Sequence, residues 1–191
     1  MFAQLDTKSV YSFMDSVVDL NTYVKRAKEL GYQSIGLMDR DNLYAAYHFA
    51  QLAIRNGLRP LIGTEANLFY EGRKIPFRLL AKNNQGYKNL MKLATELSSG
   101  QREFTYFSDY LNDIALILPS EDWEPGMSLG SEVFIGVRPE DAGKEFDYPV
   151  VPLHTVRYFE NADRSTIQML HAISQNDSLS EASICPMNLL L

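Results

Sequence analysis

Two strand–helix–strand units follow one another within the first seventy residues, and this alternation constrains the fold more than any other feature of the sequence. Apolar residues at helical spacing predict a helix over 20–30, which Asn21 can cap, and a second helix over 42–56. Buried apolar runs predict strands over 2–6, 34–38 and 59–68. Because this alternation is typical of parallel strands joined by right-handed crossovers, the sequence predicts an α/β fold.

The rest of the chain continues the pattern with less regularity. Residues 69–76 contain the turn EGRK, which predicts a hairpin. Seven strands in 191 residues fit either an open sheet or a compact α/β barrel, and periodicity does not separate the two. The further elements that the pattern predicts are strands over 77–82, 114–118, 132–137 and 149–153, and helices over 85–97 and 163–175.

Charge and cysteine content exclude several classes of protein. Eighteen basic residues against twenty-four acidic ones give a net charge of −6, whereas a domain that holds nucleic acid alone shows a basic stripe. The single cysteine, Cys185, excludes a disulfide framework and a thiolate zinc site, and indicates the cytoplasm. The sequence has no apolar run of the roughly 20 residues that a membrane-spanning helix needs, so no membrane contact is expected. The C-terminal Leu189, Leu190 and Leu191 suggest a truncated chain with an exposed apolar patch.

Polar residues gather at the predicted strand ends, where parallel α/β folds carry their active sites. Carboxylates in such positions could bind Mg²⁺ or Mn²⁺. The alternative is that Asp39 and Asp41 only cap the helix that begins near Asn42. The candidates are Asp6, Lys8, Asp39, Arg40, Asp41, Glu65, Thr155 and Arg157.

The three histidines add little to a metal site. His48 and His171 lie within predicted helices and are expected to be surface or partly packed residues. His154 follows a strand, but alternation places it on the face opposite Thr155 and Arg157. The sequence also lacks a phosphate-binding glycine loop and a nucleophile elbow.

Several segments, taken together, resemble a known family. YSFMDS resembles its Y-S-L-L-D-G, and the segment LMDRDNLYAAYHF resembles L-T-D-H-G-N-x-x-G-A-x-x-F. GLRPLIGTEANL, LLAKNNQGYKNLMKLAT and VVPLHTVRYFENADRSTIQMLHAISQNDSLSE resemble three further motifs in the right order. The chain is thus similar, from Phe2 to about Glu181, to the PHP (polymerase and histidinol phosphatase) domain of bacterial DNA polymerase III alpha subunits, with a poor match over 99–148.

The resemblance implies a distorted (β/α)7 barrel of the PHP type over residues 1–181. Residues 182–191 would then begin the connection to a polymerase core that lies downstream. The parent chain would be a DNA-directed DNA polymerase, a nucleotidyltransferase of DNA replication with Mg²⁺ in its core. Its partners would be the remainder of the polymerase chain, DNA and replisome proteins. In some members the PHP domain binds metals and proofreads, and related proteins hydrolyse phosphate esters.

This sequence departs from the family at the metal-ligand positions. Only Asp6 and Glu65 could still hold a metal, because Lys and Arg carry no free lone pair and repel a divalent ion. We therefore expect a degenerate site without metal or catalytic residues, and a fragment that is inactive alone. The former ligand positions are Asp6, Lys8, Arg40, Glu65, Pro76, Thr155 and Arg157.

Three functions remain to be compared. The first is a non-catalytic structural domain of a replicative polymerase. The second is an active metal-dependent 3′–5′ exonuclease or phosphoesterase, which needs the missing ligands. The third is a stand-alone receiver-like binding module, which Asp6, Asp39 and Lys82 faintly suggest and the motif order disfavours.

The cations at former ligand positions predict a salt-bridge network in place of the metals. At least one of them is expected to contact Asp6, Asp39 or Glu65, with Arg157 the first choice because its guanidinium can grip a carboxylate with two bonds. The alternative is that these side chains point into solvent, where such pairs contribute about 0–1 kcal/mol. The predicted network comprises Asp6, Lys8, Asp39, Arg40, Glu65 and Arg157.

Overall fold

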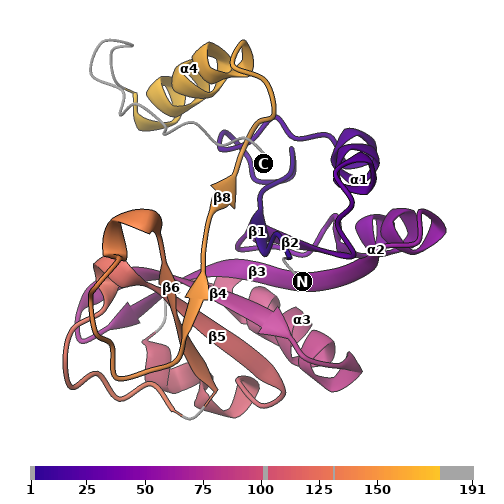
Figure 1. The fold of residues 1–191 in the computed structure, drawn as a ribbon. Coiled ribbons are helices and arrows are strands. Elements are labelled where there is room, and N and C mark those ends of the chain that lie inside the picture. The colour runs from indigo at the N-terminus through magenta and orange to yellow at the C-terminus, as the bar shows by residue number, and fades with distance from the viewer. Residues whose placement is uncertain (1–2, 101–102, 131, 177–191) are drawn as a thin grey trace. The chain divides into compact units, whose positions relative to one another are not determined.

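The computed structural model describes residues 3–100, 103–130 and 132–176. It is an α/β fold in which helices and strands are interspersed along the chain (Figure 1). The chain divides into two compact units. The first is formed by the described residues within Met1–Arg40, Tyr44–Leu61 and His154–Leu191, and the second by those within Asp41–Leu43 and Ile62–Leu153.

The first unit joins the N-terminal segment to the last described helix. β1 pairs with β8 in parallel, so that Asp6 lies opposite Thr155, 149 residues further along the chain (Figure 1). The sequence did not predict β8 as a strand. In chain order the elements are β1 (Asp6–Thr7), α1 (Leu20–Glu29), β2 (Ser34–Arg40), α2 (Ala46–Arg55), β8 (Thr155–Val156) and α4 (Asp163–Gln175).

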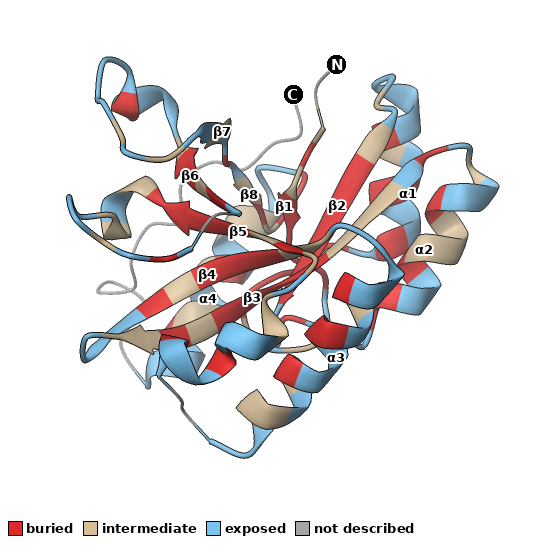
Figure 2. Cartoon of the chain, turned by 90° about the horizontal axis from the view of Figure 1, so that it is seen from below, coloured by how far each residue is buried: buried red, intermediate tan, exposed pale blue. Residues whose placement is uncertain are grey.

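Helices α1 and α2 bury one face each and expose the other, as the alternating colours in Figure 2 show. Tyr23 of α1 stacks on Phe49 of α2, with ring centroids 5.8 Å apart. Tyr23 also donates a hydrogen bond of 2.9 Å from its hydroxyl to the carbonyl oxygen of Gly36. The buried phenol thus keeps its polar end satisfied while its ring contributes to the core.

A glycine permits the close approach of β2 to the segment before β1. A Cβ atom at Gly36 would lie 2.1 Å from the carbonyl oxygen of Leu5, which is too close for any side chain. The same segment is tied to β2 by a parallel bridge between Gln4 and Ile35. Gly36 therefore sets the spacing of the strands that carry Asp6 and Asp39.

The second unit is a sheet with helices. Its strands run in the order β3-β4-β5-β6-β7, and β3 begins in the first unit and continues into the second. β3–β4 and β4–β5 are antiparallel, whereas β5–β6 and β6–β7 are parallel, so parallel pairing holds for only part of the sheet. Its elements are β3 (Arg59–Tyr70), β4 (Arg73–Ala81), α3 (Asn84–Ser98), the 3₁₀ helix η1 (Phe104–Tyr110), β5 (Ile114–Pro119), η2 (Ser120–Asp122), β6 (Val133–Val137), η3 (Pro139–Asp141) and β7 (Val150–Pro152).

The predicted hairpin is present and explains the antiparallel pair. Glu71 and Gly72 both have positive φ, at 50° and 78°, as the central residues of a tight two-residue hairpin turn do. This turn fixes the register of β3 against β4 and places Glu65 opposite Arg78. An apolar core fills the unit, with Phe77, Leu79 and Leu116 almost completely buried.

Two predicted details of the first unit are wrong. The capping residue of α1 is Asp19, whose side chain accepts from the Thr22 backbone N–H at 3.0 Å, because the helix begins at Leu20 and Asn21 already lies within its first turn. Helix α2 begins at Ala46 instead of Asn42, after Asp41 has adopted a left-handed φ of 53°. The predictions for residues 182–191, including Cys185 and the three terminal leucines, concern residues outside the described ranges.

Candidate functional site

The parallel pairing of β1 with β8 gathers three of the predicted site residues. Lys8 is completely buried, and its ammonium nitrogen lies 2.8 Å from Asp6 Oδ1 and 2.6 Å from the carbonyl oxygen of Met38. Thr155 donates from its hydroxyl to the other carboxylate oxygen of Asp6 at 2.7 Å. Asp6 thus has a cation on one oxygen and a hydroxyl on the other.

Asp39, at the end of β2, is held by hydroxyl and backbone donors. Its Oδ1 accepts from the Ser9 backbone N–H at 2.6 Å and from the Ser12 hydroxyl at 2.7 Å, and its Oδ2 accepts from the Ser9 hydroxyl at 2.7 Å. Three such donors stabilise the charged carboxylate in a buried position. Asp39 therefore fastens the loop that follows β1.

Arg40 and Arg157 converge on a carboxylate that the sequence reasoning missed. Arg157 Nε lies 2.9 Å from Asp15 Oδ1, and Arg40 Nη2 lies 2.9 Å from Asp15 Oδ2. His171 Nε2 is 3.1 Å from Asp15 Oδ1, so this histidine, which was expected to be a surface or partly packed residue, is partly packed and belongs to the cluster. The first-choice contact of Arg157 with Asp6, Asp39 or Glu65 is wrong. The sequence could have pointed to Asp15 as a site residue, because it is the aspartate of the motif YSFMDS.

Glu65 and Pro76 lie in the second unit, on the β3–β4 hairpin. Glu65 Oε2 is 3.3 Å from Arg78 Nη2, and both side chains are almost completely buried. Arg78 also donates from Nη1 to the carbonyl oxygen of Pro76 at 2.6 Å. The sequence reasoning did not single out Arg78, although the register set by the turn at Glu71 and Gly72 places it directly opposite Glu65.

Neither of the aspartates considered as helix caps has that role. Helix α2 has Ala45 at its N-cap position without a side-chain cap. Asp41 instead accepts from the backbone N–H and the side-chain amide of Asn67, at 3.1 and 3.2 Å. The capping alternative is therefore wrong for both Asp39 and Asp41.

The described part of the chain does not assemble a set of metal ligands. Within residues 3–100, 103–130 and 132–176, no group of three or more His, Cys, Asp or Glu side chains could hold a metal ion. His48 and His154 are both exposed. In these same ranges, no helix is long and apolar enough to cross a membrane.

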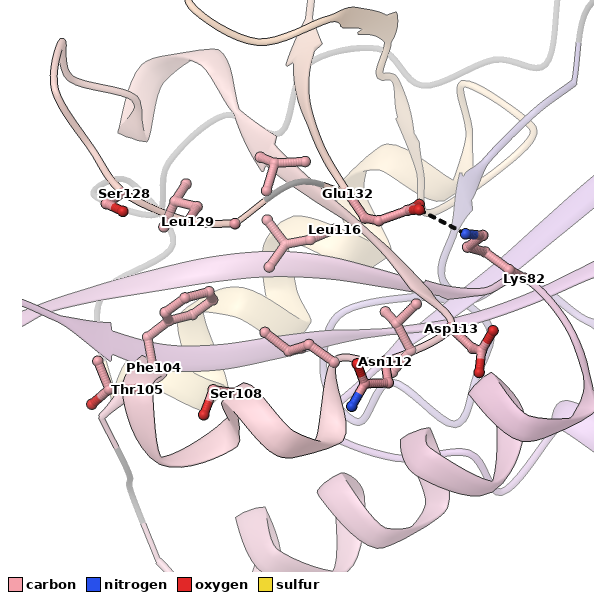
Figure 3. Close-up of a pocket in the computed structure, with 14 residues that line it drawn as sticks. Lys82, Phe104, Thr105, Ser108, Asn112, Asp113, Leu116, Ser128, Leu129 and Glu132 are labelled. Atoms are coloured by element: carbon pink, nitrogen blue, oxygen red, sulfur yellow. Dashed lines mark hydrogen bonds and ion pairs between the residues drawn. The ribbon is translucent and has the colours of Figure 1, made fainter.

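The second unit contains a cavity of about 750 Å³ (Figure 3). None of the site residues that were predicted at strand ends lines this cavity. Phe104, Leu116 and Leu129 provide apolar lining, and Lys82 lies 2.9 Å from Glu132 at its rim. Asn112 and Ser108 add neutral polar groups. The lining also includes the Asp113 carboxylate, which accepts from the Asn83 side-chain amide at 2.8 Å.

Comparison with known families decides the assignment. Residues 4–130, two thirds of the chain, match the PHP domain family.

The chain belongs to the PHP domain family.

Relatives of this PHP domain are much longer proteins. It is 46% identical over 186 residues to a DNA polymerase III subunit alpha of Streptococcus pyogenes serotype M1, covering 96% of this chain and 18% of the relative. A DNA polymerase III subunit alpha of Bacillus subtilis is 33% identical over 126 residues, covering 63% of this chain and 11% of the relative. The chain thus spans less than a fifth of the length of these curated relatives.

A solved structure of an amidohydrolase from Chromobacterium violaceum is also similar. It shares 18% sequence identity with a TM-score of 0.43, and the match covers 51% of this chain and 33% of the other. This likeness is too distant to carry an argument about chemistry. The motifs and the polymerase relatives therefore remain the basis for the functional argument.

The contacts of Lys8 bear on the metals that the family resemblance implies. The Lys8 ammonium occupies the space between the Asp6 carboxylate and the Met38 carbonyl, where it makes the contacts that a cation would make. A divalent ion beside Asp6 would meet this buried positive charge at close range.

Proposed function

We propose that this PHP domain is a structural, non-catalytic part of a replicative DNA polymerase III alpha subunit. The observation that carries the proposal is the buried Lys8, whose ammonium contacts Asp6 and the Met38 carbonyl. The Arg78–Glu65 pair gives the second unit a similar internal cation. Side chains that neutralise these acids make the fold independent of a bound metal.

The parent chain, on this proposal, is a DNA-directed DNA polymerase of the cytoplasm. The length of the matched relatives supports this proposal, because more than four fifths of their sequence lies outside the region that resembles this chain. The catalytic Mg²⁺ would lie in that other part, together with the contacts to DNA and replisome proteins. Residues 1–181 would form the PHP domain, and residues 182–191 would lead toward the core.

Metal analysis of the purified chain beside a nuclease assay tests the proposal. The chain is incubated with Mn²⁺ and Zn²⁺, freed of loosely bound ions, and assayed on 3′-labelled DNA. A PHP domain with histidines at the corresponding positions is the positive control. We expect less than stoichiometric metal and no 3′–5′ cleavage. Two metal ions per chain at the Asp6 end, or metal-dependent cleavage, would instead support the exonuclease or phosphoesterase alternative.

A further inference from the structure

The loop between β1 and α1 exposes apolar side chains. Phe13 is 82% exposed, Val10 51% and Tyr11 49%. The three lie within four residues of sequence and leave much apolar surface in water. This loop, residues 9–16, is called the aromatic loop below.

The aromatic loop is fixed at its base. Ser9 and Ser12 both bond to Asp39, and the Arg40 backbone N–H donates to the Ser12 hydroxyl at 3.1 Å. Asp15, two residues after Phe13, is anchored by Arg40, Arg157 and His171. Arg40 therefore contacts residues on both sides of Phe13.

Further bonds close the base of the loop. Ser16 donates from its hydroxyl to the Lys8 carbonyl at 2.7 Å, and the Val10 N–H donates to the Val18 carbonyl at 3.1 Å. Met14, next to Phe13, has a left-handed φ of 59°. A strained non-glycine residue persists only where its surroundings determine the backbone.

A rigid loop that displays aromatic side chains has the properties of a binding anchor. Ordering a loop and its side chains on binding costs free energy, and a loop that is already ordered avoids most of this cost. Aromatic anchors that enter a pocket dominate the energetics of protein interfaces. The structure thus combines preorganisation with the residue type that interfaces use.

We propose that the aromatic loop is the surface through which this PHP domain docks against the remainder of the polymerase chain. The inference rests on the proposed function and names the surface involved. The relatives' length supports the choice of partner, because most of their chain lies outside the matched region. A protein fits better than nucleic acid, since the net charge of −6 repels phosphates and Val10 offers no stacking surface.

The partner surface should be an apolar pocket. Phe13, which is 82% exposed here, would supply the anchor that enters this pocket.

Photocrosslinking in the full-length polymerase tests the contact directly. A benzophenone amino acid replaces Phe13, and the matched control places it at Tyr47, which is 71% exposed on α2 of the same unit. After irradiation, mass spectrometry identifies the linked peptides. We expect position 13 to link to peptides beyond residue 191 at least about tenfold more than position 47, because anchor residues lie at the centre of an interface.

A substitution provides the second measurement. Phe13→Asp should lower the unfolding temperature of the full-length polymerase, because it places a charge in an apolar pocket. Phe13→Leu should largely preserve it. In the 191-residue chain both variants should leave the unfolding temperature unchanged, since Phe13 is exposed there.

Several outcomes would overturn the inference. Equal crosslinking at positions 13 and 47, or crosslinks to primed DNA in place of protein, would each contradict docking on the polymerase chain. A loss of stability from Phe13→Asp only in the 191-residue chain would show that Phe13 serves the fold. Metal binding or nuclease activity would overturn the proposed function and leave the crosslinking result to decide the contact.

Discussion

Lys8 illustrates what a buried charge needs in order to be tolerated in a folded domain. A buried ammonium is costly because it loses its water, and it is tolerated only where charge and hydrogen bonds replace that water. Here Asp6 supplies the charge at 2.8 Å and the Met38 carbonyl supplies a further acceptor. Because Asp6 is equally buried, each member of the pair depends on the other.

Removing the Lys8 charge alone should destabilise the domain strongly. Lys8→Met keeps a long apolar stem but removes the ammonium that lies 2.8 Å from the buried Asp6 carboxylate. We expect a loss of about 3–5 kcal/mol in the free energy of unfolding, measured by urea denaturation at neutral pH.

The double variant Asp6→Asn with Lys8→Met is the matched control for this pair. It removes both charges and should recover much of the loss, as replacement of a whole buried ion pair commonly does. Lys25→Ala, which breaks an exposed pair with Glu29, should change stability by about 0–1 kcal/mol. Equal effects of Lys8→Met and Lys25→Ala would contradict the role assigned to Lys8.

At the scale of elements, the start of α1 depends on Asp19. Its carboxylate accepts from the Thr22 backbone N–H at 3.0 Å and also from the Thr22 hydroxyl at 3.2 Å. Asp19→Ala should lower the free energy of unfolding by about 1 kcal/mol. Asn21→Ala, two residues away on the exposed first turn, is the control and should stay within about 0.5 kcal/mol. Thermal melts of the two variants check the difference. A larger loss of stability from Asn21→Ala than from Asp19→Ala would show that Asn21, and not Asp19, caps the helix.

In the second unit, Asp141 joins η3 to η2. Its carboxylate receives bonds from the Lys144 ammonium at 2.7 Å, the Ser120 hydroxyl at 2.5 Å and the Arg138 backbone N–H at 2.9 Å. These donors, Lys144 first, hold the pKa of Asp141 well below its usual range. The charged form is therefore the form that stabilises the folded state.

The lowered pKa of Asp141 predicts a particular pH dependence. Stability from this group is fully present above the unfolded pKa of about 3.9 and is lost as the pH falls from there toward the lower folded pKa. Asp141→Asn should therefore be less stable than the parent chain at pH 7, and the difference should shrink at pH 3. Urea denaturation at the two pH values measures this. A difference that is equal at both would show that the charge of Asp141 is not involved.

At the scale of the whole molecule, the chain corresponds to a small part of its matched relatives. Its matched relatives extend far beyond it, since it covers 18% of the Streptococcus pyogenes protein. Two-metal nucleotidyl transfer needs several carboxylates that hold metal ions close together. Among the described residues no group of three such ligands is gathered.

We therefore expect the 191-residue chain to lack polymerase activity. A primer-extension assay with Mg²⁺ and all four nucleotides checks this, with the full-length polymerase as the positive control. The physical reason is that residues 3–100, 103–130 and 132–176 do not gather the carboxylates that could hold metal ions beside a primer end and a nucleotide. Template-dependent nucleotide incorporation by the purified chain would contradict the proposal that the polymerase site lies outside these 191 residues.

The sequence by itself determined the α/β class, most element positions and the family. Apolar periodicity and turn residues are local properties, so they located α4 at Asp163–Gln175 and the hairpin around Glu71. The motif order was enough to identify the PHP domain, because each motif is a short contiguous segment. The same comparison predicts that Lys8 and Arg40 stand at former metal-ligand positions, which stays a prediction.

Only the tertiary structure decided which charges meet. Asp15 receives Arg157 and His171 from more than 140 residues away, and β8 exists only because its two residues pair with β1. Such contacts join segments that are far apart in the sequence, and local periodicity carries no information about which distant segments pack together. The contact of Arg78 with Glu65 depends on both kinds of information. The hairpin register, which is local, places the two residues opposite each other, whereas their burial is a property of the folded chain. Pairing and burial set the energy of a charge, and both are properties of the folded chain.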